Sequence, residues 1–377
     1  MIEIVSDNIV SSFGFSTDIN YQAVKAGRTS VEAYPDLLSS GVGTAASYIG
    51  NKVFNEVFAD FCMLDPDHYS KVEKAVMLSV KMASQDCNVD LSRPDTAFYL
   101  ATTKGNVHYL DLGDAHNPAI PLWHTAKRVA KYFGNSTTPV VVSNACISGL
   151  SAIIAAARAL ESGRIRCAVV SGVDMLSKFV ILGFSSLKAL SAEPCRPFDI
   201  NRNGLNLGEA AATVILQRAD SRSKLPKFVA GFMRNDAYHI SSPSKTAEGS
   251  FNVLTDVLKN VKASDVAFVN AHGTSTLYND EMEAVAIARA GLDAVPVNSL
   301  KGCFGHTLGA AGILESIISV RALQDGTVLK TIGFGELGVS KRINVAAENT
   351  ATDKKYFIKL ISGFGGSNSA ALFKKGE

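Results

Sequence analysis

Cys146 is the first residue of the chain whose type and surroundings suggest chemistry. It follows three valines at 140–142 and precedes an alanine-rich segment that extends to residue 160. This pattern predicts a buried strand, a turn and a helix, with the cysteine at the start of the helix. The unpaired N–H groups there lower the pKa of a thiol, and the small Ser148 and Gly149 leave room for a substrate. A catalytic nucleophile is one interpretation, and a buried core cysteine is the other.

Two histidines and a lysine follow apolar runs in the second half of the chain. His272 lies in NAHGTST after the segment VAFV, and Lys301 and His306 lie in SLKGCFGH after the segment VPV. Together with Cys146 they would supply a nucleophile, two imidazoles and a fixed positive charge. Each histidine alone has a second interpretation, because such a residue often only hydrogen-bonds a backbone carbonyl. The loops lack the short ligand spacing of metal sites, so no metal is predicted.

The elements that position these residues recur in the two halves of the chain. Four pairs of segments match in the same order: 96–105 with 265–273, 139–146 with 294–301, 157–163 with 320–326, and 208–218 with 367–375. Cys146 then corresponds to Lys301. Strands separated by helices predict parallel sheets covered on both faces, with chemistry at the carboxyl ends of the strands. We therefore predict an α/β fold with duplicated halves, residues 1–220 and 221–377.

Outside the repeat, apolar periodicity predicts further elements. A strand is expected at 2–10, helices at 21–26 and 72–84, and a strand at 356–362. Residues 31–70 mix Gly, Ser, Asp and Pro with weak periodicity, which favours loops and short elements.

The composition excludes several classes of protein. A chain of 377 residues that is 47% hydrophobic and 19% charged can form two substantial cores. A net charge of +2 without a basic stripe argues against nucleic-acid binding. Six scattered cysteines without a C-x-x-C pair suit a reducing compartment. We find neither a signal peptide nor an apolar run of membrane-spanning length, so we expect no membrane contact and a soluble, cytoplasmic protein.

Five motifs together resemble the beta-ketoacyl-[acyl-carrier-protein] synthases of the thiolase superfamily, most closely the branch that elongates acyl chains. They are SNACISG, NDAYH, NAHGTST, SLKGCFGHTLGAAG and SGFGGSNSA. The resemblance implies a thiolase-like fold in which two α/β halves form a five-layer αβαβα core. It also implies a homodimer, with a heterodimer of related subunits as an alternative, and an acyl carrier protein as partner.

The resemblance further implies a reaction and the residues that perform it. Cys146 would take an acyl group from a carrier-bound thioester, and the decarboxylation of a malonyl thioester would then generate an enolate. His272 and His306 would donate N–H groups to the enolate oxygen. The backbone N–H groups of Cys146 and Phe364 would form a separate oxyanion hole. No metal or nicotinamide cofactor is required.

Other residues are assigned supporting roles by the same resemblance. Lys301 would pair with Glu283 and order the site. Thr274, Thr276, Asn206 and Gly365 are expected to contact the substrate or its phosphopantetheine arm. The carrier protein of the family is acidic, and Arg202 and Lys71 are the expected basic contacts, although solvated surface charge is the other interpretation of both.

Departures from the family pattern leave alternatives open. Asn206 stands where an aliphatic residue is common, Leu277 where proline is common, and the segment after Lys104 is short. These departures make a ketosynthase of a specialised polyene or pigment pathway a competitor to fatty-acid elongation. A non-catalytic partner resembling the chain-length factors would lack the nucleophile, and a thiolase would need a second cysteine near the end of the chain.

Overall fold

One large folded sheet organises the molecule. The computed structural model describes residues 1–85, 87–220 and 222–377, and eleven strands of these residues form the sheet. Its first half has the order β1 (Ile2–Ser11), β8 (Ala210–Arg218), β6 (Cys167–Asp174), β4 (Thr96–Ala101), β5 (Val140–Val142). Its second half has the order β9 (Lys227–Asn235), β16 (Ser367–Lys374), β15 (Tyr356–Gly363), β10 (Val266–Asn270), β11 (Pro296–Asn298), β13 (Asn344–Val345).

The two halves share one topology. In each half the first three strands are antiparallel, and the third to fifth strands are parallel. β4 and β5 of the first half thus correspond to β10 and β11 of the second half. The halves join where Ile2 and Glu3 of β1 pair with Phe228 and Lys227 of β9. The predicted duplication of an α/β unit is confirmed.

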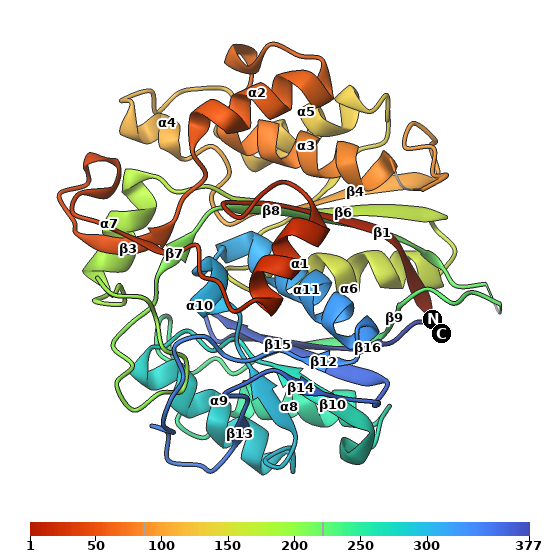
Figure 1. The fold of residues 1–377 in the computed structure, drawn as a ribbon. Coiled ribbons are helices and arrows are strands. Elements are labelled where there is room, and N and C mark those ends of the chain that lie inside the picture. Colours follow the sequence, from red (N-terminus) through yellow and green to blue (C-terminus); the bar gives the residue numbers. More distant parts are fainter. Residues whose placement is uncertain (86, 221) are drawn as a thin grey trace.

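Helices form three layers around the two halves of the sheet (Figure 1). The outer layer on the first half contains α2 (Asn51–Cys62), α3 (Lys71–Gln85) and α5 (Leu122–Tyr132), and the outer layer on the second half contains α8 (Glu248–Leu258) and α9 (Leu277–Arg289). α1 (Thr17–Lys25), α6 (Ser148–Glu161) and α11 (Ala311–Gln324) lie between the two halves. This is the five-layer αβαβα arrangement expected from the resemblance.

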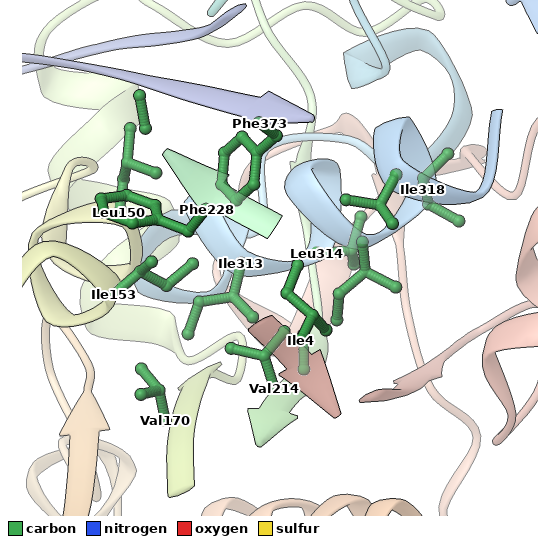
Figure 2. Packing of buried hydrophobic residues seen from close by; sticks show 14 of the residues in the cluster. Ile4, Leu150, Ile153, Val170, Val214, Phe228, Ile313, Leu314, Ile318 and Phe373 are labelled. Carbon is green, nitrogen blue, oxygen red and sulfur yellow. The ribbon is translucent and has the colours of Figure 1, made fainter. Parts of the chain in front are cut away.

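The central helices are apolar around most of their circumference because both sides face a sheet. Twelve of the fourteen residues of α11 are buried, and α6 is similarly enclosed. Leu150 and Ile153 of α6 meet Ile313 of α11, and Val170 and Phe373 contribute from the two halves of the sheet (Figure 2). The loops at the ends of the strands therefore rest on a central layer that is almost completely buried.

Short elements complete the fold. The short helices are α4 (His108–Asp111), α7 (Lys178–Ser186), α10 (Lys301–Phe304), η1 (Leu37–Ser39), η2 (Pro66–His68), η3 (Ala263–Asp265) and η4 (Leu308–Ala310). The short strands are β2 (Glu32–Tyr34), β3 (Thr44–Ser47), β7 (Leu207–Gly208), β12 (Thr327–Val328) and β14 (Thr350–Ala351). Among the described residues, none of the helices combines the length and the apolar character needed to cross a membrane.

Two sequence expectations about elements were wrong. The segment 31–70 contains the twelve-residue helix α2, whose Phe54, Phe58 and Cys62 are buried one turn apart and pack over α3. The valine run before Cys146 is not a buried strand, because β5 is the last strand of the sheet and Val140 is 41% exposed. The strands expected at 2–10 and 356–362 and the helix expected at 72–84 are confirmed within two residues as β1, β15 and α3.

Candidate active site

Cys146 lies on a sharp turn between β5 and α6. The preceding Ala145 has a φ of +44°, in the left-handed region that residues with a side chain rarely adopt. Ser148 stabilises the turn, because its Oγ donates to the carbonyl of Ala145 at 2.6 Å and accepts from the N–H of Asn144 at 2.8 Å. The strained turn sets the cysteine at the start of α6 and at the carboxyl end of the parallel strands.

The thiol of Cys146 is buried, and this changes its expected acidity. Burial raises the pKa of Cys146 to about 11, while Lys301 and Lys104 act in the opposite direction. The lowered pKa expected from the helix terminus is therefore not what the site produces. Because the thiol stays protonated near neutral pH, its attack requires a base to accept the proton.

Gly149 serves a purpose other than the one expected from its size. A Cβ atom at this position would lie 2.7 Å from the carbonyl oxygen of Gly309 in η4. The glycine therefore allows close contact between α6 and η4, and it does not open a path for a substrate. This contact sets the position of the first turn of α6 relative to the second half of the chain.

The loop that carries His272 is held by two carboxylates of α9. Glu283 accepts hydrogen bonds from the backbone N–H groups of His272 at 2.7 Å and Gly273 at 2.6 Å. Asp280 accepts from the N–H groups of Thr274 and Ser275 at 2.9 and 3.1 Å. Glu283 thus positions the histidine through its backbone.

Lys301 does not pair with Glu283, contrary to the expectation from the resemblance. Its ammonium contacts Glu315 of α11, and both side chains are buried. The carboxylate of Glu283 is already occupied by the two backbone N–H groups and by Asn279 Nδ2 at 2.8 Å. Glu315 is therefore the residue that balances the charge of Lys301.

The hydrogen bonding of His306 defines its tautomer. Its Nδ1 accepts from the N–H of Leu308 at 3.3 Å, so a neutral ring carries its proton on Nε2. Nε2 is buried and has no hydrogen-bond partner among the described residues. The backbone of His306 is fixed to the first half of the chain, since its N–H donates to the carbonyl of Asn206 at 2.7 Å.

The two halves of the chain bring Cys146, His272 and His306 together. A sulfur or nitrogen atom of each lies within 4.8 Å of the others. The rings of the two histidines are 4.9 Å apart and nearly perpendicular. Burial lowers the pKa of both imidazoles, and the neighbouring Lys301 lowers it further. Neutral imidazoles next to a thiol can accept its proton and donate N–H groups to a developing oxyanion. A metal ion held by these three residues would face the excess positive charge of Lys301 and Lys359, which share the one carboxylate of Glu315, so the site favours anionic groups.

A cavity of about 450 Å³ opens onto these three residues. Thr274, Thr276, Phe364 and Gly365 line it, as expected from the sequence. Phe364 is 40% exposed, and the centre of its ring lies 5.9 Å from that of Phe184. The proposed oxyanion-hole residues, Cys146 and Phe364, thus both border the cavity.

Asn206 does not line this cavity, in contrast to the sequence expectation. It is fully buried, its Oδ1 accepts from the N–H of Cys195 at 2.6 Å, and its Nδ2 donates to the carbonyls of Ser191 and Glu193. The polar side chain therefore anchors the loop at 191–195. Its departure from the family pattern says nothing direct about the length of the substrate.

The two expected basic contacts for a carrier protein are internal. Lys71 lies 2.5 Å from the buried Glu209, and Arg202 is buried and donates to the carbonyls of Asp199 and Gly338. Neither side chain is a free surface charge. Lys188, which no sequence pattern marked, is exposed and lines the cavity.

The sequence also left Glu315, Lys359 and Asp174 without a role. Glu315 and Lys359 interrupt the apolar runs GILESII and FIKLI. A single charged residue in such a run was the signal that could have marked each of them as a buried charge. Asp174 ends β6 and accepts from the N–H groups of Gly309 and Thr103 at 2.7 and 3.0 Å. It thereby ties the loop after β4 to η4.

Comparison with known proteins identifies the family to which this site belongs. A profile described as "Beta-ketoacyl synthase, N-terminal domain" matches residues 64–222, and one described as "Beta-ketoacyl synthase, C-terminal domain" matches residues 228–335. The chain belongs to the beta-ketoacyl synthase family. The two profiles together span all the residues of the Cys146, His272 and His306 cluster.

Individual members of the family resemble the chain over different lengths. The "3-oxoacyl-[acyl-carrier-protein] synthase 2" of Vibrio harveyi is 36% identical over 255 residues, which are 63% of this chain and 61% of that protein. The chain thus matches about three fifths of this curated relative. A beta-ketoacyl synthase from Burkholderia phymatum STM815 superposes with a TM-score of 0.88 at 25% identity and covers 100% of this chain and 99% of that one. A ketosynthase in complex with its chain length factor from Xenorhabdus doucetiae shares the fold, with a TM-score of 0.85 at 22% identity. The superposition covers 99% of this chain and 98% of that one.

Proposed function

We propose that the chain is a condensing acyltransferase that joins an acyl group to a malonyl unit with loss of carbon dioxide. The convergence of the Cys146 thiol and two neutral imidazoles, at most 4.8 Å apart on the wall of one cavity, supports this proposal. The family membership and the similarity to a 3-oxoacyl-[acyl-carrier-protein] synthase support the same activity.

The first half-reaction transfers the acyl group to the enzyme. An imidazole accepts the proton of the Cys146 thiol, and the sulfur attacks the carbonyl of an acyl thioester. The N–H groups of Cys146 and Phe364 stabilise the oxyanion. The carrier thiolate leaves and takes up the proton, so the products are the acyl-enzyme and the free carrier thiol.

The second half-reaction forms the carbon–carbon bond. A malonyl thioester loses carbon dioxide, and the electron pair of the broken bond forms an enolate. The enolate oxygen accepts hydrogen bonds from the ring N–H groups of His272 and His306. The enolate carbon attacks the acyl carbonyl, and the Cys146 sulfur leaves as a thiolate that takes up a proton from water. The product is a 3-oxoacyl thioester that is two carbons longer than the acyl group.

An acyl carrier protein is the proposed donor of both thioesters. Thr274 and Thr276 lie on the cavity wall with their hydroxyls 2.9 Å apart, where they can hydrogen-bond a phosphopantetheine arm. We also propose that two copies of the chain associate through the exposed edge of β5. No cofactor takes part in the proposed chemistry, and the expected cytoplasmic location stays a prediction.

The proposal is tested by mass spectrometry of the intact protein and of the carrier. The enzyme is incubated with a panel of acyl-carrier thioesters that differ in length and unsaturation, and malonyl-carrier is then added. We expect an acyl adduct on Cys146, followed by a 3-oxoacyl-carrier product; the preferred acyl chain separates fatty-acid elongation from a polyene pathway. Cys146→Ala should form no adduct, and Cys62→Ala, on α2, should behave as the parent protein. An adduct on Cys146→Ala would contradict the proposal.

A further inference from the structure

Lys359 is a buried lysine for which the proposed reaction has no use. It lies in the apolar strand β15, and its side chain is fully buried. Its Nζ is 2.5 Å from Glu315 Oε2 and 3.4 and 3.3 Å from the carbonyl oxygens of Asn270 and Ala271. Burying an ammonium is unfavourable even when it is paired, so an apolar residue would serve the core better. The chain places this charge beside the last residues before His272.

Lys359 shares its carboxylate partner with Lys301. Glu315 Oε1 contacts Lys301, and Glu315 Oε2 contacts Lys359. Although burial alone would raise the pKa of Glu315, the two lysines together lower it, so the carboxylate is ionised. Burial lowers the pKa of Lys359 to about 8 even beside Glu315, so its ammonium is still charged at neutral pH. Two ammonium groups thus face one carboxylate, and this buried cluster of Lys301, Glu315 and Lys359 carries one net positive charge.

The net charge acts on the two active-site histidines. Burial is the largest cause of the low pKa of both imidazoles, and Lys301 is the next. Lys359 lowers the pKa of both as well, after His306 in the case of His272. A protonated imidazole would bind the malonyl carboxylate as an ion pair and thereby stabilise the ground state of decarboxylation. It would also be unable to accept the proton of the Cys146 thiol. The reaction as proposed therefore requires both rings to be neutral.

We propose that Lys359 is a positioning residue that keeps the imidazoles of His272 and His306 neutral by giving the buried cluster its net positive charge. This inference rests on the proposed function of the same site. The charged groups that act on Lys359 are Glu315 of α11, Lys301 of α10 and Glu283 of α9. Because Lys301 and Glu315 neutralise each other, the excess charge of the cluster comes from Lys359.

Two variants separate the charge of Lys359 from its contacts. Lys359→Met removes the ammonium and leaves Lys301 and Glu315 as a neutral pair. The double variant Lys359→Met/Glu315→Gln also removes the carboxylate, so that Lys301 restores one net positive charge. Lys354→Met is the matched control, since Lys354 Nζ also donates to a carbonyl of β10, that of Val266 at 3.1 Å, at the opposite end of the strand.

The direct measurement is an NMR titration of protein labelled with ¹³C-histidine, in which His272→Asn and His306→Asn assign the signals. In Lys359→Met we expect the pKa of both imidazoles to rise by roughly one unit. The double variant should return both values toward those of the parent protein, and the control should not change them. The rate of malonyl decarboxylation should fall on acidification, and the pH at which it falls should be higher in Lys359→Met than in the parent protein. In the double variant this pH should return toward the parent value.

Unchanged imidazole titration in Lys359→Met, or a shift that the double variant does not reverse, would overturn the inference, because a purely structural contact cannot be restored by Glu315→Gln. If Lys359→Met does not fold, Lys359→Gln replaces it, since glutamine retains a donor for the two carbonyls without the charge. A parent protein that fails to decarboxylate malonyl-carrier would contradict the proposed function, and the NMR titration would still decide the role of Lys359.

Discussion

His306 has a hydrogen-bonding pattern that assigns it one step of the reaction. Its Nδ1 is occupied by the N–H of Leu308, and its buried Nε2–H has no partner among the described residues. We predict that His306→Ala retains acylation of Cys146 and loses malonyl decarboxylation by roughly 10²–10³-fold, because the enolate oxygen loses a donor. Intact mass measures the first activity, and release of carbon dioxide from malonyl-carrier measures the second.

Cys146→Gln is the complementary control for this prediction. It should abolish acylation and leave decarboxylation active, because the amide fills the place of the acylated cysteine beside intact histidines. Parallel loss of both activities in either variant would contradict separate roles for the cysteine and the imidazole.

The types of the reactive residues could be predicted from the sequence, and several of their partners could not. Cys146, His272, Lys301 and His306 each follow an apolar run, and the common edge of parallel strands brings them together. The partner of Lys301 depends on how α11 lies against the sheet, which no local pattern encodes. For the same reason Asn206, Lys71 and Arg202 could not be recognised as buried anchors of neighbouring loops.

The contact between α6 and η4 positions the nucleophile at the scale of elements. Gly149 has no room for a Cβ atom against Gly309. We predict that Gly149→Ala lowers the free energy of unfolding by about 1–3 kcal/mol and the rate of Cys146 acylation by about 10²-fold, because α6 must move away from η4. Unfolding in denaturant measures the change in stability, and rapid-quench acylation assays measure the change in rate.

Gly183 provides the matched control for this substitution. It lies within α7 with nothing within 4 Å of an added Cβ atom, so Gly183→Ala should stabilise the protein slightly or leave it unchanged. Equal acylation rates in Gly149→Ala and the parent protein would show that the contact does not position the thiol.

Elements were predictable where the sequence was strongly periodic. The strands β1 and β15 and the helix α3 carry clear apolar patterns, and the repeat revealed the common order of the two halves. α2 was missed because glycine, serine and proline surround its single apolar stripe. β5 was predicted as buried because three valines indicate a strand without showing whether a neighbour covers both of its edges.

At the scale of the whole molecule, the free edge of β5 predicts self-association. In the described part of the chain β5 is the last strand of the sheet, and Val140 is 41% exposed there. We predict that the protein has twice the 40.0 kDa chain mass in solution and that Val140→Lys shifts it to the monomer, because a charge on an edge strand opposes strand pairing. Light scattering after size-exclusion chromatography measures both masses.

A valine-to-lysine substitution away from β5 is the control. Val53 is 59% exposed on α2, and Val53→Lys should leave the mass unchanged. A parent protein that is monomeric at micromolar concentration would show that the edge of β5 does not join two copies.

The shared central layer has a consequence for how the chain folds. α6 contacts β9 and β16 of the other half of the sheet, and α11 contacts β1, β6 and β8 of the first half. Neither half can therefore cover its inner sheet face alone, although the two halves are structural repeats. β1 finds its partners β8 and β9 only after some two hundred residues have been synthesised. Folding should thus be slow and cooperative across the halves.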